Sequence, residues 1–533
     1  MSVPLTDGVL HMGTTKIGDE IARRRDVLKQ TGAGLQVGKL PEPAYQPFED
    51  FSAGLNVSRP PESTGVNSSP AALDMQVDAR NRLVKLPGVG QIEALTHTPT
   101  ALFIHPNLDN AADTVLIAAP YYGIRVAGAT VWTDGGLPVG GEWTSTLHAN
   151  SLLLTNNIGD VYVRPLGGST INPIGWGEAA ALQSFAGRVF AGGANIGGQR
   201  NPLGIKWTGS SGDYTDFTGE GSGYELLLSD TAENDRIVAM RAISFRLLVV
   251  LLRKGIWVGS FTGDSVRPAD FEPRVVGVGA VSGRCVASTP QGVLFLSDKG
   301  VMLFDGTNLQ SVSESIDSAI LPIDYGTIRR YHAVYSVVRQ TYTLFTPNGT
   351  FIYELQKKRW LQTTLVADTG AGLFNPLTVD YGLSAGWGVS WSGFWSIAPA
   401  GGANSLFDDE LFVKGTLLGR PDINLSSNFG VAQTPYWTTP EADLDGMTEM
   451  VRYSRFDLDF DGVGQLGLEL PDHTGQFRSV MAAPLDSMNV RSSRRFDLNV
   501  TGLGMAARVR VLGGNPRLWR FGLRVVDTGR RTT

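Results

Sequence analysis

Three acidic residues at alternate positions are the strongest candidate for chemistry in this chain. Residues 457–462 read Asp-Leu-Asp-Phe-Asp-Gly, which matches the opening of a calcium-binding loop. Such a loop needs a bidentate Glu at its twelfth position, but Leu468 stands there and Glu469 comes one residue late. The aspartates also alternate with apolar residues, as in a half-buried strand whose polar side chains face solvent: Phe456, Leu458 and Phe460. We therefore favour a strand over a calcium site.

Two further motifs match enzyme patterns by letter only. Residues 462–467 fit the dinucleotide-binding pattern, which works only where a strand leads into a helix. Another strand-like run and Pro471 follow here, which indicates a hairpin. Residues 382–386 fit the nucleophile elbow around Ser384, but the aromatic, glycine-rich stretch 387–395 is not helical in character. We expect neither a dinucleotide site nor a catalytic serine.

Histidine and cysteine usage gives no sign of a metal site. No two histidines have the spacing of zinc ligands: His11, His97, His105, His148, His332 and His473. Cys285 is the only cysteine, so no intrachain disulfide can form, and the strand-like run 284–287 indicates a small buried side chain. The sequence therefore predicts no catalytic residue, no cofactor-binding residue and no metal ligand, so we expect no enzyme.

The charge balance bears on nucleic acid as a partner. Lys and Arg number 45 against 51 Asp and Glu, a formal net charge of −6. A protein that grips DNA through its phosphates normally has a basic surplus. A mildly acidic surface is instead compatible with DNA that must slide past without docking. The chain begins without a signal-peptide pattern, and its longest apolar run, 247–252, is far too short for a membrane helix.

Short strand-forming runs separated by turns fill residues 96–430. Several of these runs pair across Gly- or Asn-containing turns, as hairpins require: 245–252 with 255–259, 293–296 with 301–304, and 342–345 with 350–353. Once the Gly/Ser/Asp-rich stretch 209–223 is set aside as a surface loop, the turns repeat every 40–50 residues or so, the size of one four-stranded propeller blade. We predict an all-β fold built on a β-propeller of six or seven blades.

The two ends of the chain differ from this middle part. Residues 1–95 are predicted to form an N-terminal arm, with one short helix over 17–30 and extended chain rich in Pro and Gly. We expect this arm to contact neighbouring subunits, because an extended segment can order on a partner's surface. Residues 431–533 lose the blade period and contain five or more alternating strands, which predicts a separate C-terminal β-sandwich.

Several of these segments resemble one known family. Residues 48–56, 67–74 and 78–88 are similar to the N-terminal signature of bacteriophage tail proteins, with Ala53 in place of one glycine of the family pattern. Residues 292–306 resemble the family's most recognisable blade. The acidic residue that precedes Ser-Pro in the family is missing here.

The resemblance implies a nozzle or tail-hub protein of a short-tailed phage. Such a protein is a β-propeller subunit of the virion tail, assembled in the host cytoplasm, that forms a homo-oligomeric ring, often a hexamer, around the DNA exit channel. It attaches to an adaptor above and to fibres or spikes at its side, and DNA passes through it without sequence-specific binding. Its function lies in assembly surfaces, so the resemblance carries over no site residue.

Two other functions stay open at this stage. A propeller that binds glycan or a host receptor would expose aromatic side chains over one blade face, for which Trp387, Trp391 and Trp395 are candidates. We favour burial in a blade core or an interface over ligand binding for these three residues. A propeller glycosidase would need two carboxylates facing each other across a pocket, and the sequence contains no motif for such a pair.

Overall fold

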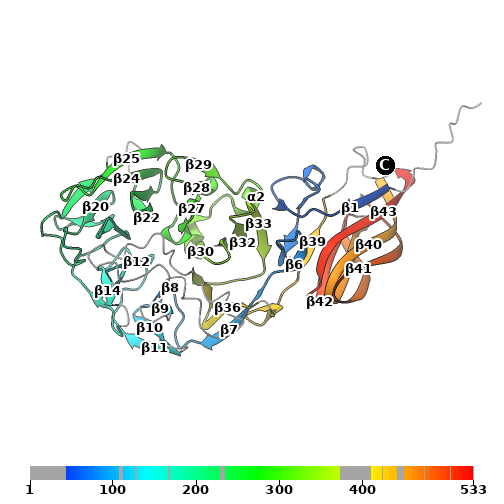
Figure 1. The fold of residues 1–533 in the computed structure, drawn as a ribbon, viewed down its shortest axis with the longest axis horizontal. Coiled ribbons are helices and arrows are strands. Elements are labelled where there is room, and N and C mark those ends of the chain that lie inside the picture. Colours follow the sequence, from blue (N-terminus) through cyan, green and yellow to red (C-terminus); the bar gives the residue numbers. More distant parts are fainter. Residues whose placement is uncertain are drawn as a thin grey trace, which may run out of the picture.

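The computed structural model describes residues 44–531 except 107–111, 127–128, 150, 166–167, 228–234, 373–409, 423, 441–448, 473 and 504–505. The predicted helix over 17–30 lies outside the described residues. The regular secondary structure of the described residues is almost entirely strand. Figure 1 shows them as a ring of sheets beside a second, separately curved sheet.

The ring is a seven-bladed β-propeller, within the predicted range of six or seven blades. Each blade is a four-stranded antiparallel sheet, and in six of them the strands follow one another along the chain. The first three blades are β8 (Ala101–Pro106), β9 (Ala112–Ala118), β10 (Tyr121–Val126) and β11 (Ala129–Asp134); β12 (Thr144–His148), β13 (Ser151–Thr155), β14 (Tyr162–Pro165) and β15 (Asn172–Pro173); β16 (Ala181–Phe185), β17 (Arg188–Gly192), β20 (Gly204–Trp207) and β21 (Gly223–Leu226). A hairpin extends the third: β18 (Asn195–Ile196) and β19 (Gln199–Arg200).

The next three blades repeat the pattern. They are β22 (Ile237–Ser244), β23 (Leu247–Leu252), β24 (Gly255–Phe261) and β25 (Ala269–Val276); β26 (Ala287–Thr289), β27 (Gly292–Ser297), β28 (Gly300–Phe304) and β29 (Leu309–Ser311); β30 (His332–Ser336), β31 (Thr341–Thr346), β32 (Gly349–Glu354) and β33 (Arg359–Thr363). Strands such as β27 are buried on both faces because each blade packs against its neighbours. The predicted turns are confirmed: Gly349 has φ of +149° and Asn157 a φ of +68°, values that Gly and Asn tolerate.

The seventh blade closes the ring with a strand from the other end of the chain. It consists of β34 (Thr369–Gly372), β35 (Glu410–Lys414), β36 (Leu417–Asp422) and β7 (Gly88–Ala94). β7 pairs antiparallel with β36, from Leu417 opposite Ala94 to Asp422 opposite Gly88. β37 (Ser427–Asn428) and β38 (Val431–Ala432) extend the edge. The propeller therefore takes in residues 88–94, which sequence reasoning assigned to the N-terminal arm.

The second sheet has nine strands drawn from both ends of the chain. Its C-terminal strands are β39 (Tyr436–Thr438), β40 (Glu449–Pro471), β41 (Phe477–Leu503), β42 (Arg508–Gly514) and β43 (Arg517–Arg531). Its N-terminal strands are β1 (Ala44–Phe48), β4 (Ala72–Leu73), β5 (Met75–Val77) and β6 (Leu83–Lys85). β1 and β6 pair with β43, and β4 pairs with β39. The separate C-terminal sandwich is thus not confirmed, because the N-terminal segment supplies four of the strands.

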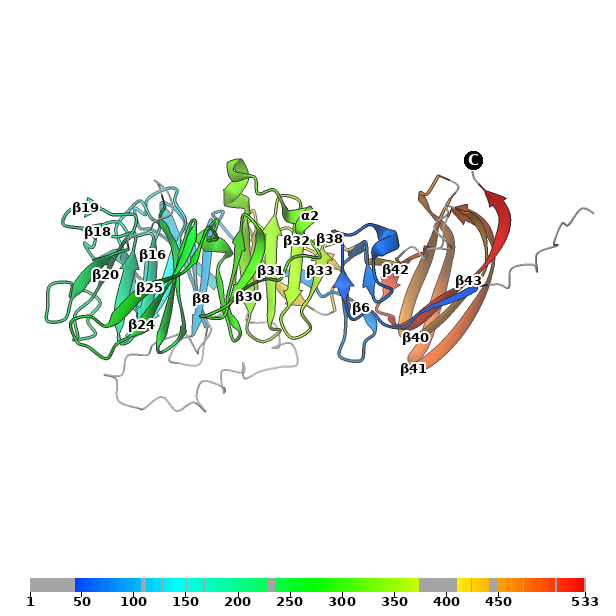
Figure 2. The ribbon, with the colours of Figure 1, turned by 90° about the horizontal axis from the view of Figure 1, so that it is seen from above.

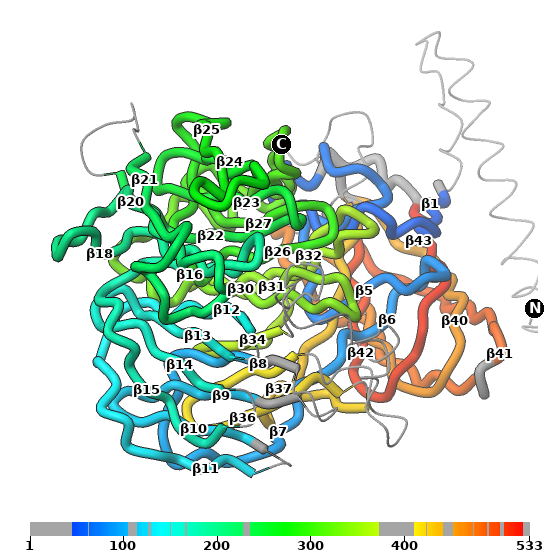
Figure 3. The backbone as a smooth tube through the Cα atoms, turned by 60° about the vertical axis from the view of Figure 1, so that its left-hand side comes forward, coloured from blue at the N-terminus to red at the C-terminus, as the bar shows by residue number. Residues whose placement is uncertain are grey.

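One hydrophobic core joins the sixth blade, the N-terminal segment and the nine-stranded sheet. The ring of Phe51 lies 5.7 Å from that of Trp437 and 5.8 Å from that of Phe521, measured between centroids. Trp360 of β33 belongs to the same core. Figures 2 and 3 show the blue N-terminal strands between the propeller and the orange and red sheet.

Helical structure is sparse in the described residues. A parallel pair, β2 (Gly54–Leu55) and β3 (Ser68–Ser69), flanks the 3-10 turn η1 (Pro61–Ser63). The other helical turns are η2 (Gly283–Cys285), α2 (Asp317–Ile320) and η3 (Tyr325–Arg330). None of the described helices is long and apolar enough to cross a membrane. The strand expected over 284–287 is wrong at its start, because η2 occupies those residues before β26 begins.

Candidate functional site

The three aspartates of the calcium-like motif lie on β40, where arginines surround them. Asp461 Oδ2 accepts hydrogen bonds from Arg82 Nη1 at 2.8 Å and from Trp519 Nε1 at 2.8 Å. Arg517 Nε lies 2.5 Å from the other carboxylate oxygen. The predicted strand is confirmed, since the alternating apolar side chains are buried: Phe456, Leu458 and Phe460.

Asp459 has a similar environment. Its carboxylate accepts hydrogen bonds from Ser493 Oγ at 2.6 Å, Arg491 at 2.8 Å and Arg520 at 2.7 Å. Burial alone would raise the pKa of Asp459, but the bonds from Ser493 and Arg491 outweigh it and hold the pKa below its ordinary value. Contrary to the solvent-facing position expected, the Asp459 and Asp461 side chains are buried under these partners. We call Asp457, Asp459, Asp461 and their arginines the Asp–Arg cluster. Its carboxylates are already neutralised, which leaves no reason for calcium to bind.

The other enzyme-like motifs gain no support. Residues 462–467 lie inside β40 and pair with β41 and β42, so no helix follows them to receive a pyrophosphate. Ser384 and the tryptophans at 387, 391 and 395 lie outside the described residues.

The histidines are placed separately. His148 is buried, with Nδ1 2.8 Å from Ser184 Oγ and Nε2 2.9 Å from the Gly212 carbonyl oxygen. His97 stacks on Tyr121 at 4.2 Å between centroids. His11 and His473 lie outside the described residues, and no group of three His, Cys, Asp or Glu among the described residues could hold a metal ion. Cys285 is buried, as predicted, and its carbonyl accepts a bond from Tyr342 Oη at 2.7 Å.

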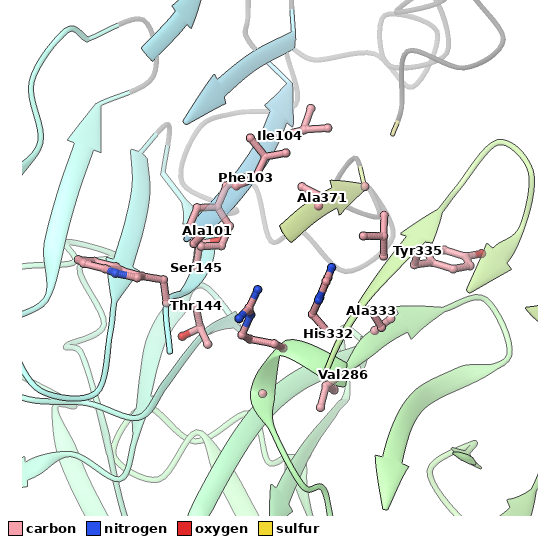
Figure 4. Close-up of a pocket in the computed structure, with 18 of the residues that line it drawn as sticks. Ala101, Phe103, Ile104, Thr144, Ser145, Val286, His332, Ala333, Tyr335 and Ala371 are labelled. Carbon is pink, nitrogen blue, oxygen red and sulfur yellow. The ribbon is translucent and has the colours of Figure 1, made fainter. Parts of the chain in front are cut away.

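A hollow lies at the centre of the propeller. A cavity of about 190 Å³ is lined by the innermost strand of every blade: β8, β12, β16, β22, β26, β30 and β34. Figure 4 shows Thr144, Val286 and His332 arranged around this space, which we call the central cavity. Propellers converge on such a centre because the blades radiate from one axis.

Two arginines face the central cavity. Arg241 comes from β22, and its guanidinium donates to the Met240 carbonyl at 2.8 Å and the Val286 carbonyl at 3.5 Å. Burial lowers the pKa of Arg241 to about 10, so the group is still charged at neutral pH. Arg284 donates to the carbonyls of Arg329 at 2.9 Å and Asp368 at 3.2 Å. No Asp or Glu is among the residues described as lining the cavity.

Two further polar side chains of the cavity lack hydrogen-bond partners in the described part of the chain, namely Thr144 Oγ1 and Ser288 Oγ. His332 stacks on Phe345 at 4.4 Å. Burial and, to a lesser extent, the charge of Arg284 lower the pKa of His332 to about 3, so its ring is neutral at pH 7. A hydrogen bond with the Arg330 backbone raises the pKa of His332, but by less than burial lowers it.

The cavity can therefore bind, but its described lining shows no constellation for covalent or acid–base chemistry. It offers two fixed cations and several neutral hydrogen-bonding groups, without a carboxylate that could serve as a general base or acid. Sequence reasoning missed these residues. The available signal was weak: Arg241 is the only charged residue in β22, whose neighbours are mostly apolar.

Comparisons with known proteins identify no family. No family model matches the chain, and no curated protein matches it. Among solved structures, a streptogramin B lyase covers 63% of this chain and 97% of its own, with 9% identity and a TM-score of 0.39. The N-terminal domain of Nup159 covers 57% of this chain and 94% of its own, with 11% identity and a TM-score of 0.33. BamB from Moraxella catarrhalis covers 56% of this chain and 90% of its own, also with 11% identity and a TM-score of 0.33. Similarities this distant carry no argument about function.

Proposed function

We propose that this protein is a structural subunit of a bacteriophage tail, a nozzle or hub protein that forms a homo-oligomeric ring around the DNA exit channel. It acts through assembly surfaces: toward other copies of itself, toward an adaptor above and toward fibres or spikes at its side. It is assembled in the host cytoplasm and ends in the virion tail. The resemblance of residues 48–88 and 292–306 to phage tail proteins is the starting point of this proposal.

The single observation that best supports a mechanical role is the continuous joint between the propeller and the nine-stranded sheet. The Asp74 carboxylate lies in this joint. It accepts hydrogen bonds from Thr363 Oγ1 at 2.8 Å, from Thr364 N at 2.8 Å and from Thr434 N at 3.3 Å. Arg359 and Lys357 of the sixth blade both donate to the Val77 carbonyl. Two bodies that share a core move as one, as a tail subunit under load must.

The fold also limits where subunits can meet. β1, β4, β5, β6 and β7 of the N-terminal segment pair with strands of their own chain. A contact between copies through residues 1–95 therefore cannot use the strand edges that are already paired within the chain. A closed propeller also leaves few free strand edges, so copies can pack side by side without uncontrolled strand addition.

Native mass by light scattering, with negative-stain images of any large species, tests the proposal. We expect a ring with an open centre, either for the protein alone or after mixing with its adaptor. A chain lacking residues 1–30 should stay folded by circular dichroism and lose ring formation. Rings that form equally well without those residues would refute the role of the arm, and a monomer under all conditions, adaptor included, would refute the ring.

A binding module is the second candidate, favoured by one specific observation. The central cavity holds unpaired polar side chains of the kind that contact a ligand. A glycan array tests the receptor-binding form of this alternative. Selective glycan binding by a monomer would favour it over the tail subunit.

A further inference from the structure

We propose that the central cavity of the propeller binds a small oxyanion, such as phosphate, sulfate or a small carboxylate, held by Arg241 and Arg284 with the hydroxyls of Thr144 and Ser288. This site does not depend on the role of the protein in a phage tail.

Arg241 is the main reason. Arg241 is half-buried at the wall of the cavity, and its guanidinium lacks a carboxylate partner among the described residues. Two backbone carbonyls take up part of its donor capacity, at 2.8 Å and 3.5 Å. A guanidinium has five N–H donors, so further donors are left for a ligand. A partly desolvated cation without a counter-ion destabilises the fold, and an anion in the cavity offsets that effect.

Arg284 adds a second cation, whose charge is partly balanced by nearby carboxylates. Glu142 and Asp368 are near enough to raise its pKa against the effect of burial, which lowers it. The Glu142 carboxylate is itself occupied, since it accepts hydrogen bonds from Ser282 Oγ at 3.0 Å and Gly283 N at 3.2 Å. The chain as a whole carries −6, yet the described lining of the cavity carries two arginines and no acid. This local reversal of charge favours an anion over a cation.

The neutral groups of the cavity fit the same ligand. The hydroxyls of Thr144 and Ser288 can each donate one hydrogen bond, and a neutral His332 can donate from one ring nitrogen. An apolar ligand would leave these hydrogen-bonding groups without partners, which disfavours it. The volume of about 190 Å³ accommodates an oxyanion of a few heavy atoms with several waters, since one water takes about 30 Å³.

Calorimetric titration with inorganic phosphate, sulfate and citrate, and thermal unfolding in each salt, test the proposal. Ionic strength is matched with sodium chloride. We expect saturable binding of at least one of these anions, and a rise of a few degrees in Tm over chloride at saturation. Binding by phosphate and sulfate alone would identify a tetrahedral oxyanion, and binding by citrate alone a carboxylate.

Arg241→Met should weaken binding about tenfold or more, because it removes a charge-assisted contact. Arg246→Met is the matched control: this arginine is exposed at the end of the same blade, and its loss should leave binding unchanged. In chloride alone Arg241→Met should be as stable as the wild type or more stable, which a purely structural arginine would not allow.

Thr144→Val serves as a second variant, since it keeps the shape of the side chain and removes one donor. We expect it to weaken binding several-fold at unchanged stability. Absence of saturable binding to the wild type, which a cavity filled by water alone would give, would overturn the proposal. So would equal affinities of the wild type and Arg241→Met.

Discussion

Buried charge and its compensation distinguish the two polar regions of this molecule at the scale of single residues. In the Asp–Arg cluster, each buried carboxylate of Asp459 and Asp461 has guanidinium partners. In the central cavity, the two arginines have no carboxylate among the described lining residues. The carboxylates of the Asp–Arg cluster have their counter-charges within the chain, whereas the arginines of the central cavity need an anion from solution. The two regions therefore respond in opposite ways to loss of a charge.

Asp461→Asn should destabilise the protein by about 3–5 kcal/mol, because it leaves the buried Arg82 guanidinium with fewer counter-charges. Chemical denaturation monitored by circular dichroism measures this change. Asp486→Asn on the exposed side of β41 is the control and should change stability by about 0.5 kcal/mol or less. Calcium should not alter the unfolding of the wild type. A calcium-dependent rise in Tm that Asp461→Asn abolishes would contradict the ion-pair assignment.

His332 should make the propeller sensitive to acid. Its pKa is lowered from 6.5 to about 3 in the folded state, chiefly by burial. Between pH 6.5 and pH 3 the unfolded chain therefore binds a proton at His332 that the folded chain does not. The free energy of unfolding is not reduced by this effect above about pH 6.5, and it falls progressively as the pH is lowered toward 3. Between pH 6.5 and pH 5 the loss is about 2 kcal/mol. His332→Phe should lose about that much less stability over this interval, measured by urea unfolding; equal slopes for both proteins would contradict it.

At the scale of elements, closure of the ring by β7 is the contact on which the propeller depends. Val89 of β7 is buried and lies opposite Pro421 of β36. Val89→Asp places an unpaired charge in this joint and should cost about 3–5 kcal/mol. Gln91→Glu on the exposed side of the same strand should be close to neutral. Thermal unfolding measures both, and a fully stable Val89→Asp variant would show that the ring does not need this strand.

The same scale shows how far sequence reasoning reaches. Six of the seven blades were predictable because each is a local meander: turns such as Asn348–Gly349 and short strand-forming runs recur within one blade length. The pairings of β7 with β36 and of β1 with β43 join opposite ends of the chain, and no local pattern signals them. The central cavity was missed for the same reason. Arg241 lies on β22, Arg284 on η2 and His332 on β30, and only the closed ring brings them together.

At the scale of the whole molecule, Asp74 ties the propeller to the nine-stranded sheet. It has a φ of +52°, which Asn also tolerates, so Asp74→Asn tests the carboxylate without adding backbone strain. The amide cannot accept at both oxygen positions, and the bonds from Thr364 and Thr434 must weaken. We expect a loss of about 1–3 kcal/mol and, by differential scanning calorimetry, a single transition that splits in two. One unsplit transition of unchanged Tm would show that the joint does not depend on this residue.

The pairing of both chain ends has a consequence for synthesis on the ribosome. β1, β6 and β7 are made early, but their partners β43 and β36 emerge only toward the end of translation. Until then the seventh blade consists of β7 alone, without β34, β35 and β36, and the second sheet lacks five of its nine strands. A chain that terminates early can therefore neither close its ring nor cover its N-terminal strands, and it exposes both to the proteases of the cell. Only a chain that extends through β43 can complete both the ring and the second sheet.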